Sequence, residues 1–212
     1  MSIVVIALIL LNVVVSFKGF NDISFFRKYE FHIGSIRSGD QIRMFSSAFL
    51  HADITHLFFN MLTLFFFAPV VIAYMGELSF LLVYFSSLLF GSLLTLLLHN
   101  DDYSYRAIGA SGAVTGVLYS AILLQPNMML GIFFIIPMPA YVFGILYLLY
   151  SIYGMRAKND NIGHTAHFGG AIGGYIFTLA KNPQMFVDNT LMVILLAIPI
   201  VILFIMAKLG KL

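Results

Sequence analysis

The chain has 212 residues, of which 61% are hydrophobic and 9% are charged, and its mean hydropathy is +0.99. Soluble domains carry about 25% charged residues, so this composition predicts an integral membrane protein and excludes a soluble globular domain. The lack of cysteine excludes disulfides and thiolate metal sites, and the 11 Lys and Arg residues form no cluster of the kind that binds nucleic acid.

Seven hydrophobic segments are candidates for membrane-spanning helices, which need about 20 apolar residues each. They lie at residues 2–17, 52–74, 78–98, 111–125, 133–154, 167–180 and 190–208. The first apolar run lacks a basic start and a cleavage site, so we expect it to be retained as a span. No repeat or linker divides the sequence. We therefore expect an all-α polytopic membrane protein with a single domain over residues 1–212.

The longest polar segment, residues 17–50, separates the first two spans. It mixes basic residues with many aromatic ones, a composition that suits a structure lying in the membrane interface. Because a structureless loop of about 30 residues is unusual, we expect short helices within it. The later loops are short, and Pro137 and Pro139 are expected to open the fifth span.

Three polar residues lie inside predicted spans rather than at their ends: Asn60, Ser111 and His167. Each precedes the polar residue that ends its helix by 14 positions. At 1.5 Å per residue, each stands about 21 Å above the same membrane face. The second, fourth and sixth spans run in the same direction, so the three side chains are expected at one depth in the membrane. That depth is roughly 10 Å below the opposite face of a hydrocarbon core about 30 Å thick.

Ser111 lies where a polar loop turns into the fourth span, within Gly109-Ala110-Ser111-Gly112. The first turn of a helix has backbone N–H groups without partners, and its dipole favours negative charge. A serine there would have oxyanion donors beside it, which is half of a nucleophilic site. The alternative is a helix cap followed by glycines that serve packing. This stretch alone favours neither interpretation.

His167 begins a face of small residues in the sixth span, namely Gly170, Ala171, Gly174 and Thr178. The fourth span carries a matching stripe, Gly112, Gly116 and Ser120. Two such stripes let helix backbones pack closely, which would bring His167 near Ser111. A general base needs to approach its nucleophile to about 3 Å. The alternative is a histidine used only for packing or capping.

His56 and Asn60 are four residues apart in the second span and therefore project from one face of a helix. Both side chains can donate hydrogen bonds. Polar groups inside a membrane are costly and tend to mark function, although hydrogen bonding between helices is the alternative use.

Three motifs occur in order: Arg43-x7-His51-x4-His56-x3-Asn60, Gly109-x-Ser111-Gly112 and Ala166-His167-x2-Gly170-x3-Gly174. Together they resemble the rhomboid family of intramembrane serine proteases over residues 41–180. The resemblance implies a six-helix core with an additional seventh helix at about 190–208. It also implies that residues 17–50 form a hairpin in the membrane interface and that the loop 155–165 is a mobile cap.

The resemblance further implies a Ser–His dyad without an acidic third member. Ser111 would be the nucleophile and His167 the general base, while the Ser111 N–H, His56 and Asn60 would form the oxyanion hole. Supporting roles would fall to Gly109, Gly112, Arg43, His51, Gly170 and Gly174. The implied partners are the lipid bilayer and transmembrane protein substrates, with no metal, no cofactor and no nucleic acid. The implied location is a bacterial inner membrane.

Three positions depart from the family pattern. An aromatic residue that commonly stacks on the catalytic histidine is replaced by Thr115. A tryptophan that often precedes Arg43 is replaced by Ile42, and a glutamate near the end of the second span by Ile72. The histidine must therefore be oriented by another group.

Two other functions compete with the protease interpretation. The first is a catalytically inactive, rhomboid-like binder of transmembrane helices. Such a binder would not need all four polar residues of the predicted site, which are Ser111, His167, His56 and Asn60. A metal-dependent membrane hydrolase or metal transporter would use His51, His56, His164 and His167, but the sequence has no H-E-x-x-H motif and few carboxylates.

The orientation in the membrane has two opposed expectations. Ten of the 11 Lys and Arg residues lie on the side of the predicted site, and only Lys181 lies opposite. The positive-inside rule would make that side cytoplasmic, whereas a bacterial rhomboid is expected to open outward. Both orientations stay open.

Overall fold

A computed structural model describes residues 2–132, 136–157 and 162–212. Its long helices are α1 (Ile3–Asn21), α5 (Ile54–Met75), α6 (Glu77–Leu98), α7 (Ser111–Leu124), α8 (Ala140–Ala157), α9 (His164–Lys181) and α11 (Thr190–Lys208). The short helices are α2 (Ile23–Tyr29), α3 (Ile33–Arg37), α4 (Arg43–Ser46), the 3-10 helix η1 (Ser47–Phe49) and α10 (Met185–Asp188). The strands are β1 (Phe31–His32), β2 (Arg106–Ala107), β3 (Met129–Ile132) and β4 (Ile136–Pro139).

The long helices confirm the predicted all-α, polytopic membrane architecture. Within the described residues, five helices are long and apolar enough to cross a membrane, namely α1, α5, α6, α8 and α11. Helix α7 is apolar but shorter. Helices α5, α7 and α9 end within one residue of the ends that the depth argument uses. The passage of all seven helices through the bilayer stays a prediction.

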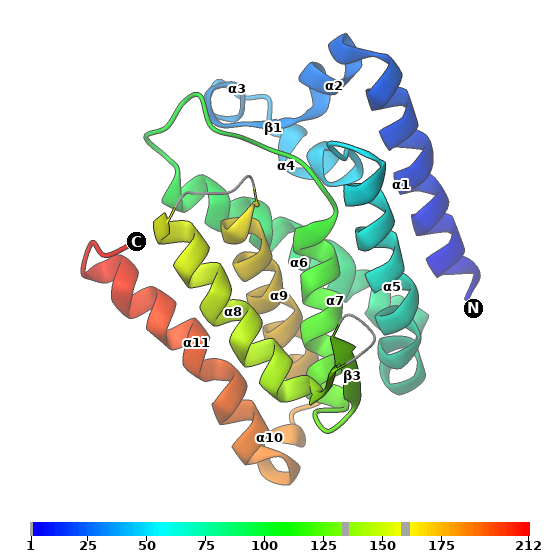
Figure 1. Cartoon of the computed structure of the whole chain (residues 1–212), viewed down its shortest axis with the longest axis vertical. Helices are drawn as coiled ribbons and strands as arrows, with labels where there is room; N and C mark the ends of the chain where they lie inside the picture. The colour runs from blue at the N-terminus through cyan, green and yellow to red at the C-terminus, as the bar shows by residue number, and fades with distance from the viewer. Residues whose placement is uncertain (1, 133–135, 158–161) are drawn as a thin grey trace.

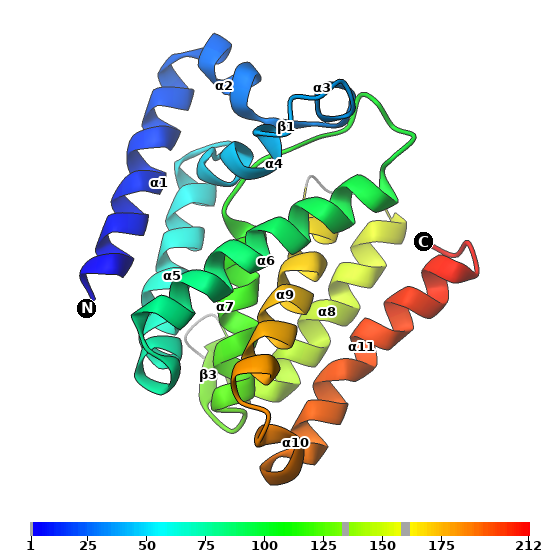
Figure 2. The same ribbon diagram turned by 180° about the vertical axis from the view of Figure 1, so that it is seen from behind.

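Helix α7 is the centre of the bundle. Figures 1 and 2 show α5, α6, α8 and α9 around it, with α1 outside α5 and α11 outside α8. Every residue from Gly112 to Leu123 is buried. This stretch contains no charged side chain, so it can be enclosed on all sides without an unpaired charge.

Helices α7 and α9 run in the same direction in backbone contact. The contacts pair positions four residues apart on both helices: Gly112 with Gly170, Gly116 with Gly174, and Ser120 with Thr178. In the first two pairs there is no room for a Cβ atom. In the third, the Thr178 hydroxyl donates to Ser120 Oγ at 2.6 Å. The predicted packing of the two small-residue stripes is confirmed, and it fixes the register of the helices.

The opposite side of α9 packs equally closely on α6. A Cβ atom at Gly169 would lie 2.8 Å from Gly91 Cα, and one at Gly173 would lie 2.8 Å from Ser87 Cα. Four glycines thus place α9 between two neighbouring backbones, where small residues allow helices to approach most closely.

The segment between α1 and α5 contains short helices, as predicted, although α1 continues to Asn21 rather than ending near residue 17. Arg43 holds the segment together. Its guanidinium pairs with Asp40 at 2.6 Å and donates to the carbonyls of Arg27 at 2.8 Å and Glu30 at 3.1 Å. The supporting role expected of Arg43 therefore has a structural counterpart in these contacts.

The same segment is joined to the loop that leads into α7. Strand β1 pairs antiparallel with β2, so that Phe31 lies opposite Ala107 and His32 opposite Arg106. The Arg106 guanidinium also forms an ion pair with Glu30, whose side chain is only 2% exposed. A buried carboxylate needs such a partner, so the pair connects the segment between α1 and α5 to the loop that leads to Ser111.

The predicted start of the fifth span is wrong. Residues 136–139 form β4, which pairs with β3 in a hairpin, and α8 begins at Ala140. Proline lacks a backbone N–H and fits poorly inside a helix, so Pro137 and Pro139 precede the helix rather than belong to it. At its other end α8 continues to Ala157, and α9 begins at His164. The predicted cap loop, residues 155–165, therefore overlaps the ends of both helices, and its residues 158–161 lie outside the described residues.

We predict that Gly174→Ala lowers the free energy of unfolding by about 1–3 kcal/mol, because its Cβ atom would overlap the Gly116 carbonyl. Thermal unfolding of the detergent-solubilised protein measures the change. Gly163→Ala is the control, since a Cβ atom there meets only Ala166 Cβ at 3.9 Å. Equal stability of the two variants would contradict a close α7–α9 contact.

Candidate active site

Ser111 is the first residue of α7 and follows a sharp turn. Gly109 has φ +116°, a conformation that side chains rarely allow, and its N–H donates to the Ser47 carbonyl at 3.0 Å. The N-cap is Ala110, so the structure does not use Ser111 as the cap. Ala110 has no polar side chain to cap the first N–H groups of the helix, which leaves them available for a negatively charged group.

The Ser111 hydroxyl and the His56 ring lie beside the same glycine. A Cβ atom at position 109 would lie 2.8 Å from His56 Nε2 and 3.7 Å from Ser111 Oγ. Gly109 thus combines a positive φ with space that a side chain would fill. The second span and the start of α7 meet at this point.

Ser111 and His167 stand on α7 and α9, two helices that pack closely against each other. Gly112 follows Ser111 in the sequence, and Ala166 precedes His167. These two neighbours are in contact, since a Cβ atom at Gly112 would lie 3.1 Å from the Ala166 carbonyl oxygen. Both side chains are half-buried, and the helix starts that carry them lie at the same end of the bundle (Figure 1).

His56 and Asn60 stand on one face of α5, as their spacing predicts. Helix α5 begins after Asp53, whose carboxylate accepts from the His56 N–H at 2.7 Å. The Ala52 N–H approaches His56 Nδ1 at 3.4 Å, so Nδ1 is the acceptor nitrogen. In the neutral ring the proton then lies on Nε2, which is the nitrogen beside Gly109. Asn60 is buried, and its amide donates to the His56 carbonyl at 3.1 Å.

His51 connects three parts of the chain and is fully buried. Its Nδ1 lies 2.8 Å from Ser16 Oγ, and the Ser16 hydroxyl donates to the Phe49 carbonyl at 3.0 Å. Its Nε2 accepts from the Ala110 N–H at 3.4 Å. One consistent pattern follows, in which His51 is neutral with its proton on Nδ1. Burial, the largest cause, lowers the pKa of His51 to about 3.

Tyr147 of α8 was not identified from the sequence. Its hydroxyl lies 2.9 Å from His167 Nδ1 and 3.2 Å from Thr115 Oγ1. Its ring is nearly parallel to the imidazole, with centroids 5.9 Å apart and an interplanar angle of 20°. Tyrosines are common in apolar helices, so no sequence signal distinguished this one.

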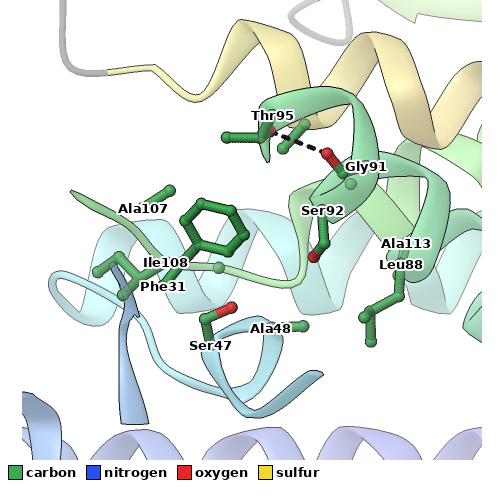
Figure 3. Close-up of a pocket in the computed structure, with 13 residues that line it drawn as sticks. Phe31, Ser47, Ala48, Leu88, Gly91, Ser92, Thr95, Ala107, Ile108 and Ala113 are labelled. Carbon is green, nitrogen blue, oxygen red and sulfur yellow. Dashed lines mark hydrogen bonds between the residues drawn. The ribbon is translucent and has the colours of Figure 1, made fainter. Parts of the chain in front are cut away.

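A small cavity lies behind the Gly109 turn. Its volume is about 30 Å³, and its lining includes Gly109, Gly112 and Ala166 together with three hydroxyl-bearing residues. Figure 3 shows these hydroxyl-bearing residues, Ser47, Ser92 and Thr95, around the cavity. A space of this size, with three hydroxyl groups among mostly apolar lining residues, can hold about one or two water molecules.

His164 is the first residue of α9 and is buried. Its ring packs edge-on against Tyr150, with centroids 5.4 Å apart, and against His167 at 6.1 Å. Over residues 2–132, 136–157 and 162–212, no three His, Cys, Asp or Glu side chains gather as metal ligands would.

Residues 38–184 match the family model described as the rhomboid domain. The chain belongs to the rhomboid family. It is 31% identical over 185 residues to RHOMBOID-like protein 12, mitochondrial, of Arabidopsis thaliana, a match that covers 79% of this chain and 55% of that protein. It is 32% identical over 145 residues to YdcA of Bacillus subtilis, provisionally named a rhomboid protease, which covers 68% of each chain.

A third relative is Rhomboid protein 1, mitochondrial, of Saccharomyces cerevisiae, with 30% identity over 142 residues. That match covers 65% of this chain and 41% of the yeast protein. The chain thus spans about half the length of these two mitochondrial relatives. The family assignment rests on the shared domain.

We predict that His51 makes the stability of this rhomboid depend on pH. The unfolded state binds a proton near pH 6.5, whereas the folded state does not until about pH 3. The stabilisation is therefore complete above pH 6.5 and is lost as the pH falls. Between pH 7 and pH 5 the free energy of unfolding should drop by about 2 kcal/mol from this group. In His51→Asn this part of the slope should vanish. Equal slopes in both proteins would show that His51 is not buried in its neutral form.

Proposed function

We propose that the protein is an intramembrane serine endopeptidase that cleaves transmembrane segments through a Ser111–His167 dyad. Membership of the rhomboid family supports protease chemistry at the family level. The contact that best supports these two residues as a dyad is that of Gly112 with Ala166, their direct neighbours. Nucleophile and base thus come from two helices whose register cannot slip without steric overlap.

The proposed first step is attack of Ser111 Oγ on a peptide carbonyl carbon. As the C–O bond forms, the Ser111 proton passes to His167 Nε2, and the carbonyl oxygen becomes an oxyanion. The Ser111 N–H, His56 Nε2–H and the Asn60 amide are the proposed donors to that oxygen. The His56 proton assignment supports this role, because Nε2 is the nitrogen on the Ser111 side of the ring.

The second half of the cycle releases both products. His167 gives its proton to the leaving amine as the C–N bond breaks, which leaves an ester on Ser111. His167 then takes a proton from water, whose oxygen attacks the ester carbonyl, and returns it to Ser111 as the acid departs. The cavity beside Gly109, whose lining includes three hydroxyl-bearing residues, is a suitable place for such a water molecule.

The proposed substrates are transmembrane segments of other membrane proteins within the lipid bilayer. A peptide bond inside an intact helix is shielded by its neighbours, so the segment must unwind locally at the cut. Residues that weaken a helix, such as glycine, are therefore expected near the cleaved bond. A bacterial cell membrane stays a prediction, since the relatives include mitochondrial proteins as well as a bacterial one.

We predict that a fluorophosphonate probe labels the detergent-solubilised protein at Ser111, as mapped by peptide mass spectrometry. Ser111→Ala should lose both labelling and cleavage of a model transmembrane substrate, because no other group replaces its oxygen nucleophile. Ser104→Ala, in the exposed loop before α7, should behave as the parent chain. Cleavage by Ser111→Ala would exclude the serine mechanism. Failure of the parent protein to react with probe or substrate would favour an inactive binder of transmembrane helices.

We predict that Asn60→Ala lowers kcat by about 10²–10³-fold, the usual effect of losing one oxyanion donor. Asn182→Ala is a matched control. The amides of both residues donate to the carbonyl four positions earlier, at 3.1 Å for Asn60 and 3.0 Å for Asn182, but Asn182 lies at the opposite end of the bundle. The same loss of kcat in both variants would point to general destabilisation instead.

A further inference from the structure

We infer that Tyr147, with Thr115 as its partner, is the positioning residue that fixes the ring plane and proton of His167. The inference rests on the proposed function, because it assigns a role within the Ser111–His167 dyad. It concerns a third helix, α8, which the dyad itself does not include.

Two contacts hold the imidazole of His167 from the side of α8. The Tyr147 ring lies nearly parallel to it, at 20°, which limits rotation of the imidazole out of its plane. The Tyr147 hydroxyl lies 2.9 Å from Nδ1, which limits rotation within the plane. Ring and hydroxyl together restrict both motions, as a preorganised base requires.

The hydroxyl contact also bears on which nitrogen carries the proton. A neutral imidazole has one N–H and one lone pair, and a base that accepts the Ser111 proton at Nε2 must keep its own proton on Nδ1. That Nδ1–H needs an acceptor, which the oxygen of Tyr147 provides. Tyr147 can act as this acceptor only if its own O–H points elsewhere.

Thr115 supplies that other direction. Its Oγ1 lies 3.2 Å from the Tyr147 oxygen, so the Tyr147 O–H can donate to Thr115 while Tyr147 accepts from His167. Both hydroxyl contacts are then satisfied in one pattern. The reverse pattern, with Tyr147 donating to Nδ1, would put the proton on Nε2 and block the base. Thr115 therefore allows the active tautomer, because its oxygen can accept the Tyr147 O–H, and the base role proposed for His167 selects this pattern.

This arrangement accounts for the small side chain one turn after Ser111. Thr115 is buried between α7 and α8, and an aromatic ring there would occupy the space that Tyr147 uses. The parallel aromatic ring comes instead from α8. The position of α8 relative to α7 and α9 thus becomes a condition for an oriented His167.

The first test measures the fluorophosphonate labelling rate of Ser111, which reports activation of the serine without any substrate. Tyr147→Phe keeps the ring but removes the hydroxyl, and it should lower the rate about tenfold through the lost hydrogen bond. Thr115→Val should lower it similarly, whereas Thr115→Ser should retain it. In cleavage assays kcat should fall with little change in KM. Tyr153→Phe, on the exposed side of α8, should label at the parent rate.

A second test reads the tautomer directly. In ¹⁵N-histidine-labelled protein, with the His167 signals assigned by comparison with His167→Asn, the parent chain should show the proton on Nδ1. Tyr147→Phe and Thr115→Val should increase the Nε2–H form, at pH 8, where free imidazole is neutral. A parent chain in the Nε2–H form, or a tautomer indifferent to both substitutions, would overturn the inference.

The two tests separate the inference from the proposed function. If Ser111 of the parent chain does not react, the protease proposal fails, while the nitrogen spectra still decide the role of Tyr147. If Ser111 reacts and Tyr147→Phe labels at the parent rate, the protease stands and the positioning role is wrong. Thermal unfolding of each variant identifies a fall in rate that comes only from loss of structure.

Discussion

The close approach of α7 and α9 is the constraint on which the rest of the structure depends. Lipid tails are as apolar as leucine, so the hydrophobic effect contributes little to the association of two helices in a membrane. Backbone contact at Gly112 and Gly116 supplies van der Waals packing instead, and it leaves no freedom to slide. The hydroxyl pair Ser120–Thr178 repeats the same spacing one turn further on. A dyad divided between two helices needs this kind of fixed register.

The segment between α1 and α5 contributes in a different way, by holding the turn before Ser111. The Ser47 carbonyl accepts from the Gly109 N–H, and the Glu30–Arg106 ion pair fixes the strand just upstream. These contacts reach the start of α7 from outside the bundle. Glycine adopts the positive φ at position 109 without strain but is conformationally free, and these contacts hold it in that one conformation. The segment between α1 and α5 therefore helps to position Ser111, the proposed nucleophile, although it lies outside the helix bundle.

The helices and the small-residue contact could be predicted because both depend on local spacing. The glycines four residues apart can be read directly from this sequence, and α5, α7 and α9 end within one residue of a polar side chain. Contacts that join distant single residues could not be predicted in this way. Nothing near Ser16 indicates that it bonds His51, and nothing near Tyr147 indicates a histidine on another helix. The error at residues 136–139 has a local cause, because a proline pair is compatible with the start of a helix and with the end of a strand.

His51, His56 and His167 show how one residue type can have different roles in an apolar environment. A neutral imidazole has one donor and one acceptor, and its neighbours decide which nitrogen is which. The Ala110 N–H makes Nε2 of His51 an acceptor, which suits a structural link. The Ala52 N–H makes Nδ1 of His56 an acceptor, so that the donor Nε2–H lies beside Gly109. For His167 the neighbour at Nδ1 is a hydroxyl, which can donate or accept. The direction of that hydroxyl must itself be set, and in the proposed mechanism His167 is the ring that exchanges a proton.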